Sequence, residues 1–420
     1  MQPQPKLLKV TYGRLAVILG GLAMFGPFSI DTVFPAFPQI GADLGAGKLA
    51  MQQTISVYLL AYAAMSVVHG PLSDAIGRKR VILAGLAVFV LASVGCALST
   101  SMPMLLFFRA LQGLSAGVGM IVGRAVIRDV LHGDDAQRLM SQVSMIFGIA
   151  PAVAPIIGGW IVGWSRWQAI FWFLALFAAV LWIVAARMLP ETHPPEARVR
   201  LRPSALLRNY LGILGNPRFV RLSIAGALNF GALFLYIASA PAFVLDLMRL
   251  GADQFGWFFV PMISGMMLGA YVSGRAAGRI DGVRLANIGF ACCGLGALLN
   301  VGYNLLVDAP RLPWAVLPVS LNAFGIALVF PILTLAILDM YPHQRGGASS
   351  LQAFTGLLSN AVVAGVLASM VSGSGIGLAL TSSAFSIGAW LVWHREQHDQ
   401  RRLRTASAAQ VMGLEPTDKM

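Results

Sequence analysis

Two charged residues, Asp31 and Arg109, lie inside long apolar runs and are the residues best placed to do chemistry. A charge at the centre of a membrane helix costs roughly 2.5–3.5 kcal/mol on insertion scales, which marks it for a functional role. A carboxylate facing a water-filled cavity can bind and release a proton, whereas arginine stays charged and pairs with carboxylates or backbone groups. We therefore predict that Asp31 carries a proton and Arg109 tunes it. The alternative for Asp31 is that it lies near the outer water boundary of the membrane. The alternative for Arg109 is that it serves as a structural clamp on the backbone of the first helix.

The composition places these charges in a membrane protein. Of 420 residues, 57% are apolar and only 11% are charged, and the mean hydropathy is +0.74. Soluble domains carry about 25% charged residues. The net charge of +13 comes from cations at the ends of apolar runs, so no basic domain for nucleic acid is expected. Cys96, Cys292 and Cys293 lie inside apolar runs and have neither disulfide nor metal spacing, so we expect no metal and no cofactor.

Twelve apolar runs are long enough to span a bilayer, which takes about 20 residues each. We predict spans near 14–36, 52–72, 79–98, 103–123, 140–163, 168–188, 218–245, 254–276, 284–306, 312–338, 346–371 and 374–394. With both termini cytoplasmic, 25 of the 30 Lys and Arg lie on the cytoplasmic side, and the outside holds only Lys48, Arg166, Arg249 and Arg311. Because positive charge is retained inside, this split predicts a multi-pass protein of the bacterial inner membrane with cytoplasmic termini.

The longest break between spans divides the chain into two groups of six. We expect a first half at 1–189, a cytoplasmic linker at 190–217, a second half at 218–394 and a disordered tail at 395–420. In the linker, Leu206, Leu207, Tyr210, Leu211 and Leu214 can form one face of an amphipathic helix over 204–214. Such a helix suits an anionic inner leaflet, and a plain tether is the alternative.

The segment 70–80, which reads GPLSDAIGRKR, joins the second and third spans. Its three cations mark a cytoplasmic loop, and Gly70 and Gly77 permit a tight turn and close helix approach. The ordered Gly, Asp, Gly, Arg and Arg resemble the loop between helices 2 and 3 of the major facilitator superfamily of secondary transporters. This resemblance implies that Asp74, Arg78 and Asp129 meet in an ion-pair relay that closes the inner side. The alternative for Arg78 is that its positive charge serves only to fix the membrane topology.

The fifth span contains GIAPAVAPIIGG at 148–159. Pro151 and Pro155 bend a helix and free carbonyls, while Gly158 and Gly159 allow a neighbour to approach. The segment resembles the helix 5 motif of the superfamily's proton antiporters, with alanines at 150 and 154 where that motif has glycine.

Taken together, these segments resemble the bicyclomycin/chloramphenicol-resistance type of multidrug:proton antiporter over about 15–393. The other matching pieces are Asp31 with Pro35 and Pro38, RALQG at 109–113, RAVIRD at 124–129, SAP at 239–241 and GASS at 347–350. Ser66 departs from the group, which often has glutamine there. The resemblance implies an all-α fold of two pseudo-symmetric six-helix halves with a substrate site between them near the midplane.

Aromatic and thioether side chains near Asp31 can form an adaptable wall for lipophilic ligands. The alternative for each of them is helix packing or lipid contact. The candidate cavity residues are Met24, Phe28, Asp31, Phe34, Tyr58, Gln112, Met145, Phe230 and Tyr236.

The expected function is proton-coupled export of lipophilic drugs by alternating access, with neutral or monovalent substrates favoured. A proton-coupled nutrient or metabolite carrier of the same fold is the alternative. A membrane enzyme is disfavoured because no nucleophile or metal motif is present. The expected partners are protons, a small drug and membrane lipids, and we expect a monomer.

Overall fold

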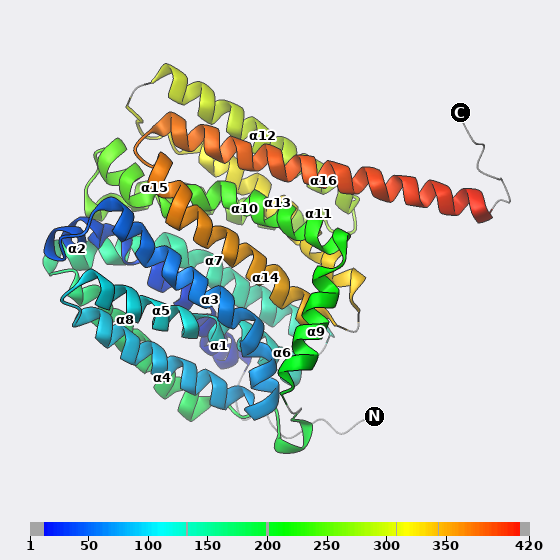
Figure 1. Cartoon of the computed structure of the whole chain (residues 1–420), viewed down its shortest axis with the longest axis horizontal. Helices are drawn as coiled ribbons and strands as arrows, with labels where there is room; N and C mark the ends of the chain where they lie inside the picture. Colours follow the sequence, from blue (N-terminus) through cyan, green and yellow to red (C-terminus); the bar gives the residue numbers. More distant parts are fainter. Residues whose placement is uncertain (1–11, 132, 199–200, 308, 343, 412–420) are drawn as a thin grey trace.

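The computed structural model describes residues 12–131, 133–198, 201–307, 309–342 and 344–411. Its regular elements in these ranges are all helical (Figure 1). Twelve helical segments are long and apolar enough to cross a membrane, as the sequence predicts. The chain is therefore an all-α, multi-pass membrane protein.

The first six spans begin with a helix that is interrupted near Asp31. Here α1 (Tyr12–Asp31) continues through the 3₁₀ turn η1 (Phe34–Ala36) into α2 (Phe37–Asp43). Pro35 and Pro38 follow the break and explain it, because proline cannot supply a helical N–H. The remaining helices of this group are α3 (Lys48–Ile76), α4 (Arg78–Ala97), α5 (Met102–Ala116), α6 (Val118–Val130), α7 (Gly133–Trp164) and α8 (Gln168–Met188).

The connecting segment holds a short turn, η2 (Pro195–Ala197), and one helix, α9 (Pro203–Leu214). The last six spans are built from α10 (Pro217–Ala238), the π-helical η3 (Ala242–Leu247), η4 (Ala252–Gln254), α11 (Gly256–Ala276), α12 (Gly282–Leu306), α13 (Leu317–Met340), α14 (Arg345–Val362), the π-helical η5 (Val363–Leu367), α15 (Ala368–Val371) and α16 (Gly375–Val411).

Helix packing is densest within each group of six spans. In the first group, α1 packs on α7, α3 on α5, and α4 on α8, while in the second α10 packs on α16, and α13 on α11 and α12. Between the groups, α3 packs along α14, and α7 packs on α11 and η4, as Figure 1 also shows for α3 and α14. These pairs form the boundary across which the two groups can move.

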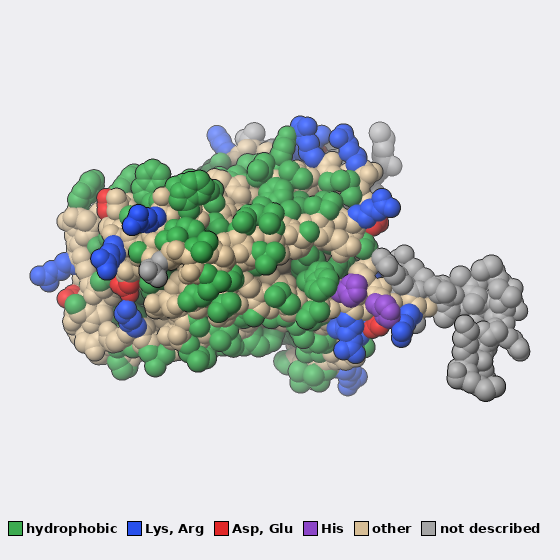
Figure 2. Space-filling view, turned by 90° about the horizontal axis from the view of Figure 1, so that it is seen from above, with side chains coloured by type: hydrophobic (Ala, Val, Ile, Leu, Met, Phe, Trp, Pro, Cys, Tyr) green, Lys and Arg blue, Asp and Glu red, His purple; other side chains and the backbone are tan. Residues whose placement is uncertain are grey.

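The surface of the helix bundle is that of a lipid-embedded protein. On the face seen in Figure 2, apolar side chains form a broad band and the charged side chains gather toward the two ends. Large apolar side chains such as Leu91, Leu298 and Met370 are fully presented to the outside. In water such a surface would associate, whereas in a bilayer it contacts acyl chains.

The last helix continues farther than expected. The sequence predicts a disordered tail from 395 onward, but α16 runs to Val411, and 412–420 lie outside the described residues. The reason is an ionic anchor just beyond the span. Glu396 is only 1% exposed and pairs with Arg218 at 3.0 Å and Arg221 at 2.7 Å, both on α10. This anchor fixes the helix past the apolar run.

Candidate functional site

Asp31 is the last residue of α1 and is 3% exposed. Val17, Gly21 and Met24 lie on the same helical face, and each of them retains accessible surface. That accessible stripe ends at Phe28, which packs on Phe173 and Phe177 of α8. Among the side chains that the structure describes, none forms a hydrogen bond or ion pair with the Asp31 carboxylate. The carboxylate thus lies just beyond the point where this face of α1 closes against α8.

Arg109 lies near Asp31 but has other partners. Its Nε donates to the Thr54 carbonyl at 3.2 Å, and its Nη1 donates to the Ser29 carbonyl at 3.2 Å and to Gln112 Oε1 at 2.8 Å. The guanidinium also lies 4.6 Å from the centre of the Tyr58 ring. Arg109 therefore ties α5 to the backbones of α1 and α3. This geometry is that of the clamp on the first helix, and tuning of Asp31 by Arg109 stays a prediction.

Several predicted cavity residues belong to this clamp or to the packed interior. The Tyr58 hydroxyl donates to the Gly26 carbonyl at 2.8 Å, and Gln112 Nε2 donates to Ser93 Oγ at 2.8 Å. Phe34 stacks on Phe259 of α11 at 6.3 Å. The buried members of the predicted set are Phe28, Asp31, Phe34, Tyr58, Gln112 and Tyr236. In this conformation these side chains are packed among the helices, and their part in a substrate cavity stays a prediction.

The other three predicted cavity residues keep accessible surface. Met145 on α7 is 58% exposed, and Met24 on α1 and Phe230 on α10 are partly exposed. Met24 and Met145 lie on helices that pack together, since the α-carbon of Gly20 on α1 faces Ile146 on α7.

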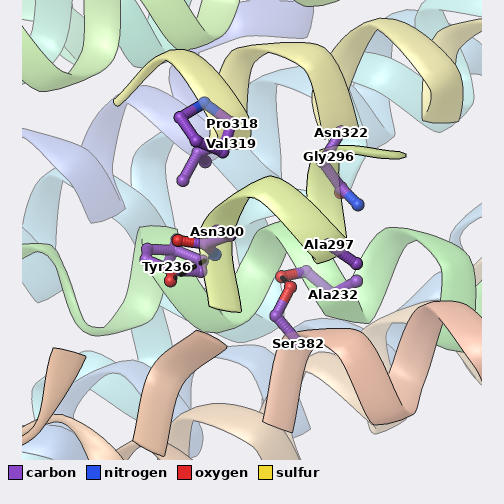
Figure 3. Close-up of a pocket in the computed structure, with 9 residues that line it drawn as sticks. All are labelled: Ala232, Tyr236, Gly296, Ala297, Asn300, Pro318, Val319, Asn322 and Ser382. Carbon is purple, nitrogen blue, oxygen red and sulfur yellow. Dashed lines mark hydrogen bonds between the residues drawn. The ribbon is translucent and has the colours of Figure 1, made fainter. Parts of the chain in front are cut away.

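Tyr236 lies in a separate polar cluster within the last six spans (Figure 3). It accepts a hydrogen bond from Asn300 at 2.7 Å, and Asn322 donates to Ser386 at 3.3 Å. The cavity beside them has a volume of about 10 Å³, roughly the space that one water molecule needs. It is too small for a drug-sized ligand. Its lining residues are Ala232, Tyr236, Gly296, Ala297, Asn300, Pro318, Val319, Asn322 and Ser382.

The loop 70–80 contracts to a single residue between two helices. α3 ends at Ile76, α4 begins at Arg78, and Gly77 turns the chain with a φ of +107°. The positive φ disfavours any side chain at Gly77, and a Cβ there would also force the Glu191 carboxylate to move. Gly70 has no such constraint: a Cβ there would meet only Ile121, at 4.0 Å. The expected close approach therefore applies at Gly77 and not at Gly70.

Arg78 is buried at this turn and joins the predicted relay. It pairs with Asp74 of its own loop, and its Nε lies 3.1 Å from Asp129 Oδ2 on α6. Its Nη1 also donates to Ser73 Oγ at 2.6 Å. The predicted group of Asp74, Arg78 and Asp129 is thus brought together by the ends of α3, α4 and α6.

Two residues after α8 complete this network and were missed in the sequence. Glu191 Oε1 accepts from the backbone N–H of Arg78 at 2.9 Å, and Thr192 Oγ1 donates to Asp129 at 2.9 Å. A carboxylate at the first turn of a helix is stabilised by the helix dipole. Their signal in the sequence was a polar pair directly following the sixth span and Pro190.

A row of polar contacts closes the opposite end of α3 against the last six spans. We call Lys48, Gln52, Gln53 and Ser56 the latch. Lys48 pairs with Asp246 at 2.7 Å. The other three donate to backbone carbonyls, namely Ala238 at 3.1 Å, Gly365 at 3.0 Å and Ala361 at 2.9 Å respectively. Two of these carbonyls lie in or beside the π-helical η5, where the α-helical bonding pattern is interrupted.

The two glycines of the fifth span tighten the same end. A Cβ at Gly158 would lie 2.1 Å from the Thr32 carbonyl, and one at Gly159 would lie 2.1 Å from the Ala252 carbonyl of η4. Close backbone approach requires glycine at both positions. Pro151 and Pro155, predicted to bend this helix, both lie within the uninterrupted α7.

Across the described residues, no cluster of His, Cys, Asp and Glu could hold a metal ion. What remains is a buried carboxylate, an ion-paired helix turn at one end and a polar closure at the other, set in twelve spanning helices. These features define a secondary transporter. Residues 17–364 match the family model described as Major Facilitator Superfamily, and the chain belongs to that superfamily.

Curated relatives cover most of the chain. The chain is 26% identical over 383 residues to a "Bicyclomycin resistance protein homolog" of Haemophilus influenzae, covering 90% of this chain and 94% of the relative. It is 29% identical to "Multidrug resistance protein D" of Escherichia coli K12, and the match covers 85% of this chain and 88% of the relative. It is 28% identical to "Chloramphenicol resistance protein CraA" of Acinetobacter baumannii, covering 76% of each.

Solved structures share the fold. The human organic anion transporter MFSD10 (TETRAN) superposes with a TM-score of 0.66 at 20% identity, covering 91% of this chain and 100% of that one. A D-xylose-proton symporter superposes with a TM-score of 0.68 at 12% identity, covering 90% and 97%. At these identities the likeness concerns the arrangement of helices.

Proposed function

We propose that this protein is a proton-coupled antiporter that exports small lipophilic drugs by alternating access. The observation that carries the proposal is the Asp31 carboxylate, which is buried within a spanning segment and has no described ion-pair partner. A carboxylate in such a place can exchange a proton when the face opens to water on one side and then on the other. The printed names of the relatives, which concern resistance to bicyclomycin, chloramphenicol and other drugs, support the choice of substrate class.

In this proposal the structure corresponds to one of the two alternating states. The latch joins the two groups of helices at the Lys48 end, and the accessible stripe of α1 leads toward the other end. Outward opening then requires the latch to break. The relay of Asp74, Arg78 and Asp129 is formed in this same state and joins helices of the first six spans only, so its proposed part in the cycle is to hold these helix ends together at the end opposite to the latch.

The proposed setting is the bacterial inner membrane with both termini cytoplasmic. The end that carries Arg78, Arg80 and α9 then faces the cytoplasm, in agreement with retention of positive charge inside. The proton gradient would supply about 2.3 kcal/mol per charge per 100 mV, plus the pH difference. The protein would act without a metal or cofactor, and the proposed partners are protons, drug and lipid.

The test uses purified protein in proteoliposomes with chloramphenicol, bicyclomycin and a panel of lipophilic cations as probes. An inward-directed proton gradient should drive drug out of the compartment that represents the cytoplasm, and an uncoupler should abolish this transport. Drug addition to detergent-solubilised protein should also release protons. Accumulation of a nutrient in place of drug extrusion, with the same uncoupler sensitivity, would reassign the protein as a carrier for uptake.

A further inference from the structure

The linker helix α9 divides its apolar residues between two different environments. Tyr210 and Ile213 are buried against the protein. Leu207, Leu211 and Leu214, spaced for one helical face, are 60%, 59% and 40% exposed. The sequence pattern predicts a single apolar face, whereas the structure leaves half of that face uncovered by the rest of the chain.

The buried side of α9 joins both groups of helices. The Tyr210 hydroxyl donates to the Val67 carbonyl of α3 at 2.8 Å. On the other side, the α-carbon of Gly347 on α14 faces Tyr210 and Ile213. Burial raises the pKa of Tyr210, so its hydroxyl stays protonated and remains a donor across the neutral range. Figure 1 shows α9 crossing from the first six spans to the last six at the end where α16 leaves the helix bundle.

The position of α9 along the chain fixes its depth. Only Gly215 and Asn216 separate Leu214 from Pro217, where the membrane-spanning α10 begins. Two residues reach at most about 7 Å, so the C-terminal end of α9 must lie near the boundary of the bilayer. The exposed leucines therefore continue the apolar surface of the neighbouring spans.

The charges beside the leucines identify what covers them. Arg208 lies about a quarter-turn from the leucine face, and Arg202 directly precedes the helix; both are exposed. Apolar residues flanked by arginine are the pattern of a helix that lies in an anionic membrane interface, with its apolar face at the acyl boundary and its cations at the headgroups.

We propose that α9 is a strap seated on anionic phospholipid, with Leu207, Leu211 and Leu214 in the interface, Arg202 and Arg208 on headgroup phosphates, and Tyr210 holding α3. Because the Tyr210–Val67 bond is present together with the closed latch, anionic lipid that seats α9 favours this same conformation. The inference rests on the membrane setting of the family and is independent of the proposed drug exchange.

Depth of the strap can be measured directly on the full chain. Single cysteines at Leu211→Cys and, as a matched control on another face, Asn209→Cys would carry a fluorophore in a cysteine-free background. In nanodiscs of phosphatidylcholine and phosphatidylglycerol containing nitroxide-labelled lipid, quenching at 211 should be several-fold stronger than at 209. Equal quenching at the two positions would mean that solvent covers the leucines, and it would overturn the proposal. Disulfide-linked dimers through position 211 would mean that a second copy covers them, and they would overturn it as well.

The lipid dependence can be read from the conformation without any substrate. Spin labels at Ile76→Cys and Ile280→Cys, both on exposed positions, report the separation of the two groups of helices. Adding phosphatidylglycerol to phosphatidylcholine nanodiscs should increase the population of the conformation described above. The double variant Arg202→Gln/Arg208→Gln should remove most of that shift, and Tyr210→Phe should reduce it while leaving quenching at 211 unchanged. A distance distribution that ignores phosphatidylglycerol, or a shift that survives the double variant, would refute the strap.

Discussion

Asp31 and Arg109 are both buried near the end of α1, yet no described ion pair joins their side chains. Arg109 reaches the carbonyl of Ser29, two residues before Asp31, and leaves the carboxylate free of any described ion pair. A permanent ion pair would hold Asp31 deprotonated and oppose proton uptake. Separation of the two charges therefore suits a carboxylate that must change its protonation state.

The first prediction concerns Asp31→Asn, which mimics the permanently protonated carboxyl. We expect retained drug binding, loss of proton-driven efflux and no proton release on drug addition. Proton release is measured by a pH dye with purified protein, and binding by fluorescence or calorimetry. Asp135→Asn, an exposed change in α7, serves as the control and should behave as wild type. A folded Asp31→Asn protein with undiminished proton-driven efflux would remove Asp31 from the mechanism.

The second prediction concerns Arg109→Lys. Lysine keeps the charge but cannot reach the Thr54 and Ser29 carbonyls together, so at least one buried acceptor loses its donor. An unsatisfied buried polar group costs about 1–3 kcal/mol, and thermal unfolding in detergent should reveal this loss. Arg166→Lys, at an exposed arginine, should leave stability unchanged. Wild-type stability together with altered proton release would favour tuning of Asp31 over the clamp.

Residue-level prediction succeeds where the energetic cost is visible in the sequence. A charge inside an apolar run is conspicuous, so Asp31 and Arg109 could be singled out. The partners of Arg109 are backbone carbonyls, which no residue type marks. For the same reason the sequence does not reveal that Tyr58 and Gln112 contact the clamp, and their place in a substrate cavity stays a prediction.

At the level of helices, the ends of α3, α4, α6 and α8 converge on one arginine. Arg78 contacts Asp74, Asp129 and Ser73, while Glu191 binds its backbone N–H. A planar guanidinium can hold several oxygen acceptors at once, which an ammonium group cannot do with the same geometry.

The third prediction is that Arg78→Lys inserts normally but loses most transport. The lysine keeps the positive charge, so topology is retained, but the fork that joins α3 to α6 is lost. Expression and detergent monodispersity check insertion, and drug efflux in cells checks function. Arg80→Lys, on the exposed side of the same turn, should transport as wild type. Full transport by Arg78→Lys would reduce Arg78 to a topology signal.

The fourth prediction concerns the latch. Gln53→Ala/Ser56→Ala removes two hydrogen bonds worth about 0.5–1.5 kcal/mol each, which shifts the equilibrium toward opening at the Lys48 end by roughly tenfold. Labelling of Phe259→Cys, a buried position that stacks on Phe34 between the two groups of helices, should accelerate accordingly. Gln254→Ala, whose side chain bonds within its own group of helices, should not change the rate. Unchanged labelling in the double variant would mean that these bonds re-form in both states.

Helix boundaries agree with the sequence prediction where the length of an apolar run determines them. They differ from it where contacts with distant residues determine them. The span starting at 79 is α4, which begins at Arg78, because Gly77 supplies the turn. The extension of α16 depends on Glu396 meeting Arg218 and Arg221 from 175 or more residues away. Ion pairs between residues so far apart in the sequence can be identified only once the fold is known.

For the whole molecule, the distribution of lysine and arginine predicts orientation. In a cysteine-free variant, an impermeant thiol reagent added outside intact cells should label a cysteine at position 48 and fail to label cysteines at 198 and 404. Permeabilised cells provide the control, because all three should then react. Efficient outside labelling at 198 would reverse the topology, and with it the proposed direction of the gate.

The number of spans could be predicted because each one must bury about 20 apolar residues in lipid, whatever its neighbours are. The way in which the two groups of helices close could not be predicted, because the packing between them depends on backbone contacts such as those at Gly158 and Gly159.

The latch has an unequal construction. Gln52, Gln53 and Ser56 supply side chains from α3, while α10, α14 and η5 answer with main-chain carbonyls that every amino acid possesses. Substitutions in the second half that preserve the backbone therefore leave these three bonds intact, except at Gly365, where any side chain would meet Ser56. Apart from Gly365 and from Asp246, which pairs with Lys48, the second half can therefore change its side chains, and with them its ligand preference, without removing the contacts that close this end.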